Sequence, residues 1–378
     1  MLPGTGGLTR LVDKRKVRRD RADVFATVAE GIKGRRAKEW GLVDEVVSSS
    51  RFKEAVEARL KAIATREGAG NRRGPGVPLP PLDPKWRPDG ATFRHVEYAV
   101  EPLARTARLV VTVPSGPVPT TPAEAHAQGA DWWLFRAFRE LEQALFDLRF
   151  NRLETGLVLL EVKGDAATVR TTDAVLAREG EDWFVAEVRH HVKRVLKRLD
   201  LTSKTFFALA TPGTCFVGTM LEIALAADRF YVKDEDGTEV ECSPMNAGPF
   251  PMPNGLTRLA TRFLADPSMV DRALATKGPI DARAALEAGI ATFAPDDLDW
   301  DDEVRLAVEE RASLSPDGLT GMEANLRFAG PETLETKIFG RLSAWQNWIF
   351  IRPNAVGERG ALSLYGKPTR PEFDWRRT

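Results

Sequence analysis

The sequence predicts an α/β protein in which strands alternate with helices and crossover connections join the strands. Three observations support this class. Short apolar runs typical of buried strands alternate with longer stretches of helical periodicity through residues 98–232. A segment rich in Pro and Gly, residues 67–91, separates this region from the first 66 residues. Finally, the pentapeptide Gly7–Leu11 recurs 248 positions later as Gly255–Leu259.

The first 66 residues predict a small group of helices behind a Gly-rich turn at residues 1–10. Helices are expected at 17–29, at 35–40 and at 51–65. The second of these ends at Gly41, and residues 42–47 favour a strand or extended segment. The third is amphipathic, because one face carries the apolar residues Phe52, Val56, Leu60 and Ile63.

After the Pro- and Gly-rich segment the pattern alternates. Strands are expected at 98–100, 109–113, 156–162, 205–210 and 229–232. Helices are expected at 132–150, 182–199 and 219–227, with Asp182 as the N-cap of the second. From Gly255 onward the sequence predicts mostly helices. Its closing helices, 332–350, are rich in aromatic residues, which favours packing on a neighbouring domain or subunit.

The recurring pentapeptide indicates an internal duplication. The same spacing carries Ala37 onto Ala285 and Gly41 onto Gly289 without a gap. A period of 248 residues is too long for a solenoid repeat and fits a whole domain. Two such domains do not fit into 378 residues, and the first copy of the motif begins at residue 2. We therefore expect a C-terminal remnant of a first domain in 1–66, a linker in 67–91 and a complete second domain in 92–378.

The composition is that of an ordinary soluble globular protein. Because 54 Lys and Arg residues balance 54 Asp and Glu residues, nothing favours nucleic acid or an anionic membrane as a partner. The two cysteines form no Cys-x-x-Cys motif, which fits a reducing compartment. No apolar run reaches the ~18 residues that a membrane span needs, and no signal peptide is recognisable. We expect a cytoplasmic protein.

Residues 205–228 combine a strand, a glycine turn and a helix of small residues. A helix N-terminus favours negative charge, and glycine lets backbone N–H groups approach a ligand closely. Glu222 lies one turn into this otherwise apolar helix, where a carboxylate needs a partner. Two interpretations of Glu222 stay open: an acid–base group, or a structural carboxylate in a capping or ion-pair role.

Two glycine-rich turns, 3–7 and 251–255, each precede Leu-Thr-Arg-Leu. They are not phosphate-binding loops, because no Gly-Lys-Ser/Thr follows. Each is either a helix N-cap turn or a turn that directs a backbone N–H at a reacting water. Cys215 lacks a nearby base and is predicted to be a small buried cysteine. His190 and His191 point about 100° apart on a helix and cannot bind one metal together, so no metal site is expected.

Together these motifs resemble the enoyl-CoA hydratase/isomerase (crotonase) superfamily. Its Gly-Gly-Gly-x-Glu-Leu-Ala-x-x-x-Asp helix is similar to residues 218–228, and its Leu-x-Pro-Gly-x-Gly-Gly-x-x-Arg-Leu turn to residues 2–11. The family's Ala-x-x-Ala-x-x-x-Gly-Leu-Val signature is similar to residues 38–46. The resemblance covers essentially the whole chain. It implies a crotonase-like ββα spiral, with one complete unit preceded by the C-terminal remnant of another.

The resemblance also implies the chemistry of a CoA thioester. Two backbone N–H groups hold the thioester oxyanion, and two glutamates act as general base and acid on water. Carried over to this sequence, the implied residues are Gly4 (a backbone N–H to the water), Glu222 (if the second domain is active), and the oxyanion-hole-like backbone positions Gly218, Thr219 and Ala167. The resemblance implies an acyl-CoA substrate, a homo-oligomer and no metal or redox cofactor.

Several residues depart from the family pattern. The counterparts of both first-domain glutamates would lie before Met1, Thr219 and Met220 replace glycines, and residues 243–246 hold no carboxylate. We therefore expect a diverged, non-catalytic second domain, and a truncated chain that is inactive alone.

The doubled architecture is similar to that of superfamily members in aerobic, CoA-dependent benzoate degradation. It implies the C-terminal part of a lyase or hydrolase that cleaves the ring of 2,3-epoxybenzoyl-CoA with water to an aldehyde–CoA ester and formate. The alternatives are a scaffold or assembly module without catalysis, and a simple enoyl-CoA hydratase/isomerase that uses Glu222.

Overall fold

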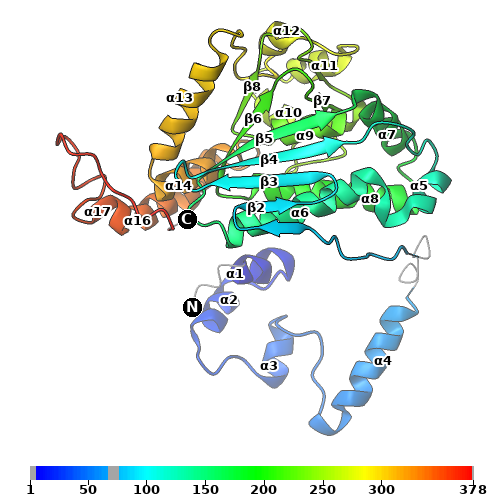
Figure 1. Ribbon diagram of the computed structural model, residues 1–378. Coiled ribbons are helices and arrows are strands. Elements are labelled where there is room, and N and C mark those ends of the chain that lie inside the picture. The colour runs from blue at the N-terminus through cyan, green and yellow to red at the C-terminus, as the bar shows by residue number, and fades with distance from the viewer. Residues whose placement is uncertain (1–5, 67–75, 377–378) are drawn as a thin grey trace. The chain divides into compact units, whose positions relative to one another are not determined.

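The computed structural model describes residues 6–66 and 76–376. The chain divides into two compact units, Met1–Arg72 and Arg73–Thr378. Figure 1 colours them from blue at the N-terminus to red at the C-terminus. Among the described residues, no helix is both long enough and apolar enough to cross a membrane.

The first unit consists of helices joined by turns (Figure 1). Its elements are α1 (Gly7–Thr9), η1 (Arg10–Lys14), α2 (Arg19–Thr27), α3 (Gly34–Glu39), η2 (Ser49–Arg51) and α4 (Phe52–Ala64). The three expected helices are therefore present. Residues 42–47, for which a strand or an extended segment is expected, form no strand; bends lie at Leu42 and Asp44, and the rest has no regular structure.

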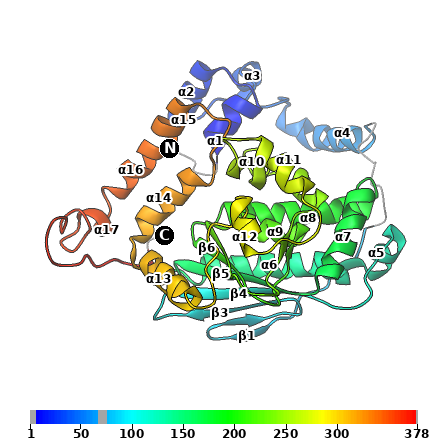
Figure 2. The same ribbon diagram turned by 90° about the horizontal axis from the view of Figure 1, so that it is seen from above.

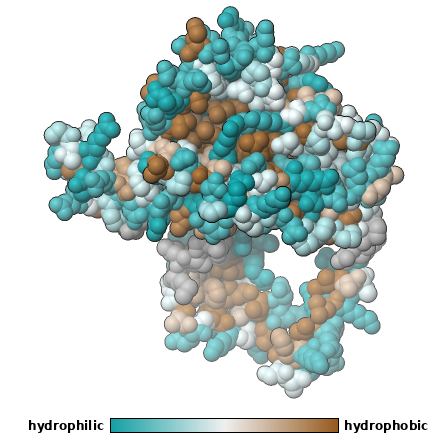
Figure 3. Space-filling view, in the orientation of Figure 1, coloured by the Kyte–Doolittle hydropathy of each residue, from teal (hydrophilic) through white to brown (hydrophobic). Residues whose placement is uncertain are grey.

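Helix α4 has an exposed apolar face. Phe52 is 62% exposed and Leu60 is 61% exposed, and Val56 and Ile63 on the same face are also exposed. Figure 3 shows apolar side chains gathered along this helix. Within its own unit the predicted amphipathic face of α4 therefore remains largely uncovered.

The second unit is built on a seven-stranded sheet in the order β1-β2-β3-β4-β5-β6-β8. Its strands are β1 (Lys85–Arg87), β2 (Gly90–Thr92), β3 (Val96–Glu101), β4 (Thr106–Val113), β5 (Leu157–Gly164), β6 (Thr205–Ala210) and β8 (Arg229–Val232). The pairs from β1 to β4 are antiparallel, and the pairs from β4 to β8 are parallel. Strands β7 (Phe216–Val217) and β9 (Val240–Glu241) form a separate parallel pair.

Strands β1 and β2 correct the expected linker over 67–91. Pro88 and Asp89 form the two-residue turn of a β-hairpin in which Arg87 pairs with Gly90. Glycine is required at position 90, because a Cβ there would lie 2.0 Å from the Tyr98 carbonyl oxygen of the neighbouring strand. Residues Lys85–Arg87 and Gly90 therefore belong to the sheet, which begins before the predicted domain start at residue 92.

The helices of the second unit cover both faces of the parallel strands. They are α5 (Pro122–Gln128), α6 (Trp133–Phe150), α7 (Ala166–Arg178), α8 (Trp183–Asp200), α9 (Gly218–Leu225), α10 (Arg258–Arg262), α11 (Ser268–Ala275), α12 (Ala282–Glu287), α13 (Trp300–Ser313), α14 (Pro316–Leu326), α15 (Leu334–Lys337), α16 (Ser343–Ile349) and α17 (Pro353–Val356), with single turns η3 (Gly129–Asp131), η4 (Pro244–Ala247) and η5 (Ile338–Leu342). Figure 2 shows α6, α8 and α9 on one side of the sheet.

Strand alternation assigns the apolar side chains to two cores. Val158, Phe206 and Phe230 belong to the larger core, which includes the buried faces of α6 and α8. Their neighbours in sequence point the other way. Leu157, Phe207 and Tyr231 form a smaller core with Trp300 of α13, against which Val304 and Val308 also pack.

Elements of the first unit recur in the second at the spacing of the sequence repeat. Helix α3 corresponds to α12 and α4 to α13, because the first position of each pair coincides after a shift of 248. Gly41 and Gly289 end α3 and α12 with φ of 75° and 70°. The residue after each glycine donates its backbone N–H back into the helix. Leu42 donates to the Ala37 carbonyl, and Ile290 donates to the Ala285 carbonyl. Both helices thus end in the same left-handed glycine cap.

Candidate functional site

The start of helix α9 is the part of the second unit where the sequence predicts a candidate site. Strand β6 leads through a turn into β7 and then directly into α9. Gly218 begins the helix with a φ of 47°, a left-handed conformation that glycine adopts readily. Every residue of α9 is buried, Glu222 included. The predicted glycine turn and short apolar helix are therefore both present.

An internal carboxylate occupies the N-terminus of α9. The backbone N–H of Thr219 donates to Asp173 Oδ2 at 2.9 Å, and the Thr219 hydroxyl donates to Asp173 Oδ1 at 2.5 Å. The hydroxyl of Ser243 donates to Asp173 Oδ2 at 2.7 Å. Asp173 comes from α7 and is 3% exposed. Burial raises its pKa to about 6, although these three hydrogen bonds oppose the increase.

The glycine at position 218 is explained by this carboxylate. A Cβ at that position would lie 1.8 Å from Asp173 Oδ2 and 2.6 Å from Ser243 Oγ. Only a residue without a side chain therefore allows Asp173 to reach the helix start. The close approach that the sequence predicted for a ligand is made here by a side chain of the same unit.

Glu222 lies in a buried ion-pair network. It is 2% exposed, and its Oε2 accepts a hydrogen bond from Arg258 Nη1 at 2.7 Å. Its Oε1 accepts from Asn246 Nδ2 at 2.8 Å. Arg258 also donates to Asp200 Oδ2 at 2.8 Å. Burial raises the pKa of Glu222, and Arg258 opposes that increase. These contacts favour the structural interpretation of Glu222, since both carboxylate oxygens are already engaged.

The structure places three of the four other residues that the sequence analysis singled out. Ala167, near the start of α7, donates its N–H to the Asp165 side chain at 2.9 Å, so this N–H is a capped helix terminus. The Gly218 carbonyl accepts a hydrogen bond from Asn246 Nδ2 at 3.0 Å. Gly4 lies outside the described residues. Cys215 is buried, as predicted, and burial raises the pKa of its thiol to about 12.

Sequence reasoning missed the partners of these residues. Asp173 lies 46 positions before Thr219, and nothing in its local pattern indicates the contact. Asn246 occupies the region where the family pattern has a Pro-Glu pair. Arg258 offered a signal, because it belongs to the repeated Leu-Thr-Arg-Leu motif. The motif predicts a turn, but its spacing gives no sign that the arginine pairs with Glu222.

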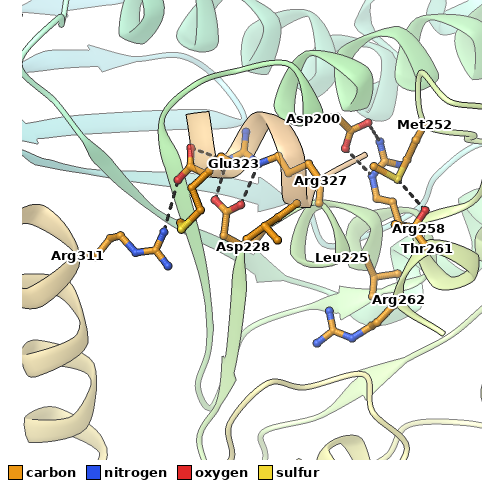
Figure 4. A pocket seen from close by; sticks show the side chains of 14 residues that line it. Asp200, Leu225, Asp228, Met252, Arg258, Thr261, Arg262, Arg311, Glu323 and Arg327 are labelled. Carbon is orange, nitrogen blue, oxygen red and sulfur yellow. Dashed lines mark hydrogen bonds and ion pairs between the residues drawn. The ribbon is translucent and has the colours of Figure 1, made fainter. Parts of the chain in front are cut away.

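A cavity of about 270 Å³ opens at the other end of α9 (Figure 4). It is lined by four arginines, three acidic residues and several apolar side chains from α9, α10, α13 and α14. Arg327 pairs with Asp228 at 2.6 Å, and Arg258 pairs with Asp200. The cavity is separate from the helix start that the sequence singled out.

The sheet order, the helix cover and the α9 start place the chain among proteins of the enoyl-CoA hydratase/isomerase, or crotonase, fold. An enoyl-CoA hydratase from Geobacillus kaustophilus is similar with a TM-score of 0.55 and 15% identity, covering 78% of this chain and 99% of that one. An enoyl-CoA hydratase/isomerase from Mycobacterium abscessus is similar with a TM-score of 0.52 and 18% identity, covering 74% and 99%. These likenesses confirm the predicted α/β, crotonase-like fold, whereas the predicted duplication stays a prediction.

Among curated proteins, benzoyl-CoA-dihydrodiol lyase from Aromatoleum evansii is 49% identical over 382 residues. The match covers the whole of this chain and 68% of the relative. The chain therefore belongs to the benzoyl-CoA-dihydrodiol lyase family. A search of protein-family models gave no match.

Proposed function

We propose that this chain forms part of a lyase that opens the ring of 2,3-epoxybenzoyl-CoA with water, giving an aldehyde–CoA ester and formate. The observation that carries the proposal is the 49% identity to a benzoyl-CoA-dihydrodiol lyase along the entire chain. The substrate and products follow from the family resemblance. The proposal includes an acyl-CoA ligand, a homo-oligomer and a reaction without metal or redox cofactor.

Within this lyase, the second unit serves as a scaffold. Its crotonase-type helix start already binds Asp173, and its single acid at the family position, Glu222, is paired with Arg258. A thioester oxygen would have to displace a buried carboxylate that accepts three hydrogen bonds. The glutamates that act on water would then lie outside residues 92–378, and this chain alone would release no formate.

We further propose that the two units descend from one duplicated domain, with residues 1–66 as the closing part of the first copy. The matching glycine caps of α3 and α12 and the matching starts of α4 and α13 support this. Gly4 would be the contribution of residues 1–66 to the water site. In the second copy, α13 covers the sheet with Trp300, Val304 and Val308. The exposed face of α4 carries Phe52, Val56 and Leu60 at the corresponding positions.

A chimera tests the proposed function. The segment of the Aromatoleum evansii lyase that aligns with this chain is replaced by residues 1–378, and formate release from 2,3-epoxybenzoyl-CoA is measured. The intact relative is the positive control, and the 378-residue chain alone is the matched control. We expect formate from the chimera and none from the chain alone. A folded but inactive chimera would contradict the proposed function, and formate from the chain alone would contradict the scaffold role.

A further inference from the structure

The cavity at the C-terminal end of α9 is independent of the proposed function and lies entirely within the second unit. Helix α9 has eight residues, so its two ends are about 12 Å apart. Five helices contribute side chains to the cavity: the end of α8 with Asp200, the end of α9, and helices α10, α13 and α14. Figure 4 shows their side chains pointing into a common space.

Two of the four arginines in the wall are already neutralised. Arg327 donates to both oxygens of Asp228, at 2.8 and 2.6 Å, and also to backbone carbonyls. Arg258 pairs with Asp200 on one side and with Glu222 on the other. These pairs are geometrically complete, so they form a rigid wall and leave no charge for a ligand.

The other two arginines have no carboxylate within hydrogen-bond distance among the described residues. Arg262 donates only to neutral acceptors, the Gly289 carbonyl at 2.6 Å and Thr292 Oγ1 at 3.3 Å. Within the described ranges, no carboxylate lies in ion-pair distance of its guanidinium. Arg311 is 8% exposed, and its Nη1 has no hydrogen-bond partner. In Figure 4 the two guanidinium groups enter from α10 and α13 and end toward the same space.

Glu323 compensates Arg311 only weakly. Its Oε1 lies 3.6 Å from Arg311 Nη1, beyond hydrogen-bond distance, and its Oε2 has no hydrogen-bond partner. Burial and the neighbouring Asp228 raise the pKa of Glu323 to about 8, against the opposing effect of Arg327. Glu323 also lies 3.4 Å from Arg327, so Arg311 shares this carboxyl with a second arginine and makes no hydrogen bond to it.

The remaining wall of the cavity is apolar. Leu225, Met252, Met322 and Leu326 line it, together with Ala226 and Ala227. At about 30 Å³ for each water-sized group, a volume of 270 Å³ holds about nine heavy atoms. An inorganic anion would pair with the arginines and leave this apolar surface uncovered, whereas an organic acid with an apolar body would fill both parts.

We propose that this cavity binds a small carboxylic acid with an apolar body of about six carbon atoms. Its carboxylate lies between Arg262 and Arg311, and its apolar body packs on Leu225, Met322 and Leu326. A carboxylate held by two guanidinium groups forms charge-assisted hydrogen bonds, the stronger class in proteins. The same arrangement discriminates against neutral molecules of the same shape, because they would leave Arg262 and Arg311 without a hydrogen-bonded anion.

Titration calorimetry of the whole 378-residue chain tests this proposal, with benzoate as the probe. Benzyl alcohol is the neutral control, and inorganic phosphate is the anion without an apolar body. We expect saturable benzoate binding at pH 7, weaker or no binding of phosphate, and none of benzyl alcohol. Arg262→Gln and Arg311→Gln each weaken benzoate binding at least about tenfold, the loss of one charge-assisted hydrogen bond. Arg305→Gln, on the exposed face of the same helix α13, leaves the affinity unchanged.

Three results overturn the proposal. The first is the absence of saturable benzoate binding up to about 10 mM. The second is phosphate binding that is tighter than benzoate binding. The third is equal benzoate affinity in the wild type, Arg262→Gln and Arg311→Gln. Because the buried Arg311 variant could fail to fold, circular dichroism is recorded for each variant. The less buried Arg262 then decides the question alone.

Discussion

Replacing Asp173 with Asn tests whether a buried carboxylate fills the start of α9. Asn has the same shape, and its oxygen can accept from the Thr219 N–H and the Ser243 hydroxyl while its amide donates to the Thr219 hydroxyl. The hydrogen bonds therefore survive, and the charge is removed. The substitution isolates the effect of ionising this one group on the free energy of unfolding.

The magnitude follows from the pKa of Asp173, which burial raises from 3.8 to about 6 in the folded protein. A raised pKa means that the folded state prefers the protonated acid. The stabilisation is complete below pH 3.8 and is lost as the pH rises through about 6. At 1.36 kcal/mol for each pKa unit, the loss is about 3 kcal/mol at pH 7.5. The amide introduced by Asp173→Asn does not titrate, so the variant should not show this loss.

Urea unfolding at pH 4.5 and at pH 7.5, followed by tryptophan fluorescence, measures the effect. From pH 4.5 to pH 7.5, we expect the free energy of unfolding of the Asp173→Asn variant to rise by about 2 kcal/mol relative to that of the wild type. Asp302→Asn, at an exposed position of α13, controls for the substitution itself. A difference between Asp173→Asn and wild type that stays constant within about 0.5 kcal/mol would refute the buried-carboxylate account.

Three further predictions concern neighbouring groups. Gly218→Ala should lower the free energy of unfolding by at least about 2 kcal/mol through overlap with Asp173, and by less in an Asp173→Ala background, as a double-mutant cycle in urea would show. Glu222→Gln should destabilise the protein by about 3 kcal/mol, because it leaves Arg258 with one charged partner fewer; a thermal shift near zero would contradict the ion pair. Benzoate affinity should fall as the pH rises above about 8, where Glu323 ionises beside Asp228, and Glu323→Gln should abolish that pH dependence in calorimetry.

The strands and long helices were predictable because their signals are local. Residues 205–210 and 229–232 form β6 and β8 with the bounds expected from their apolar runs. Asp182 caps α8 through hydrogen bonds to two backbone N–H groups, as its place before an amphipathic run predicted. The predicted helix end at Gly41 is confirmed, and Gly289, which the spacing of 248 positions aligns with it, also ends a helix.

The chemistry of the α9 start was not predictable to the same degree, because it depends on contacts between distant residues. The local sequence around Glu222 would be the same whether this residue faced a substrate or Arg258, which lies 36 positions away. Asp173 sits in a polar stretch of α7 that suggested no buried role, yet it is enclosed by Thr219 and Ser243. Helix α7 was itself missed, because Thr168, Thr172 and Asp173 interrupt the apolar pattern of its buried face.

The scaffold role of the second unit is tested most directly by formate release from the chimera with the Aromatoleum evansii lyase. Asp173→Asn and Glu222→Gln are introduced into it, and circular dichroism establishes that each variant is folded. If the second unit is a scaffold, both variants should turn over within about twofold of the unmodified chimera, because neither carboxylate then touches the substrate. A fall of about a hundredfold or more in a folded Glu222→Gln variant would instead make that glutamate an acid–base group and contradict the account.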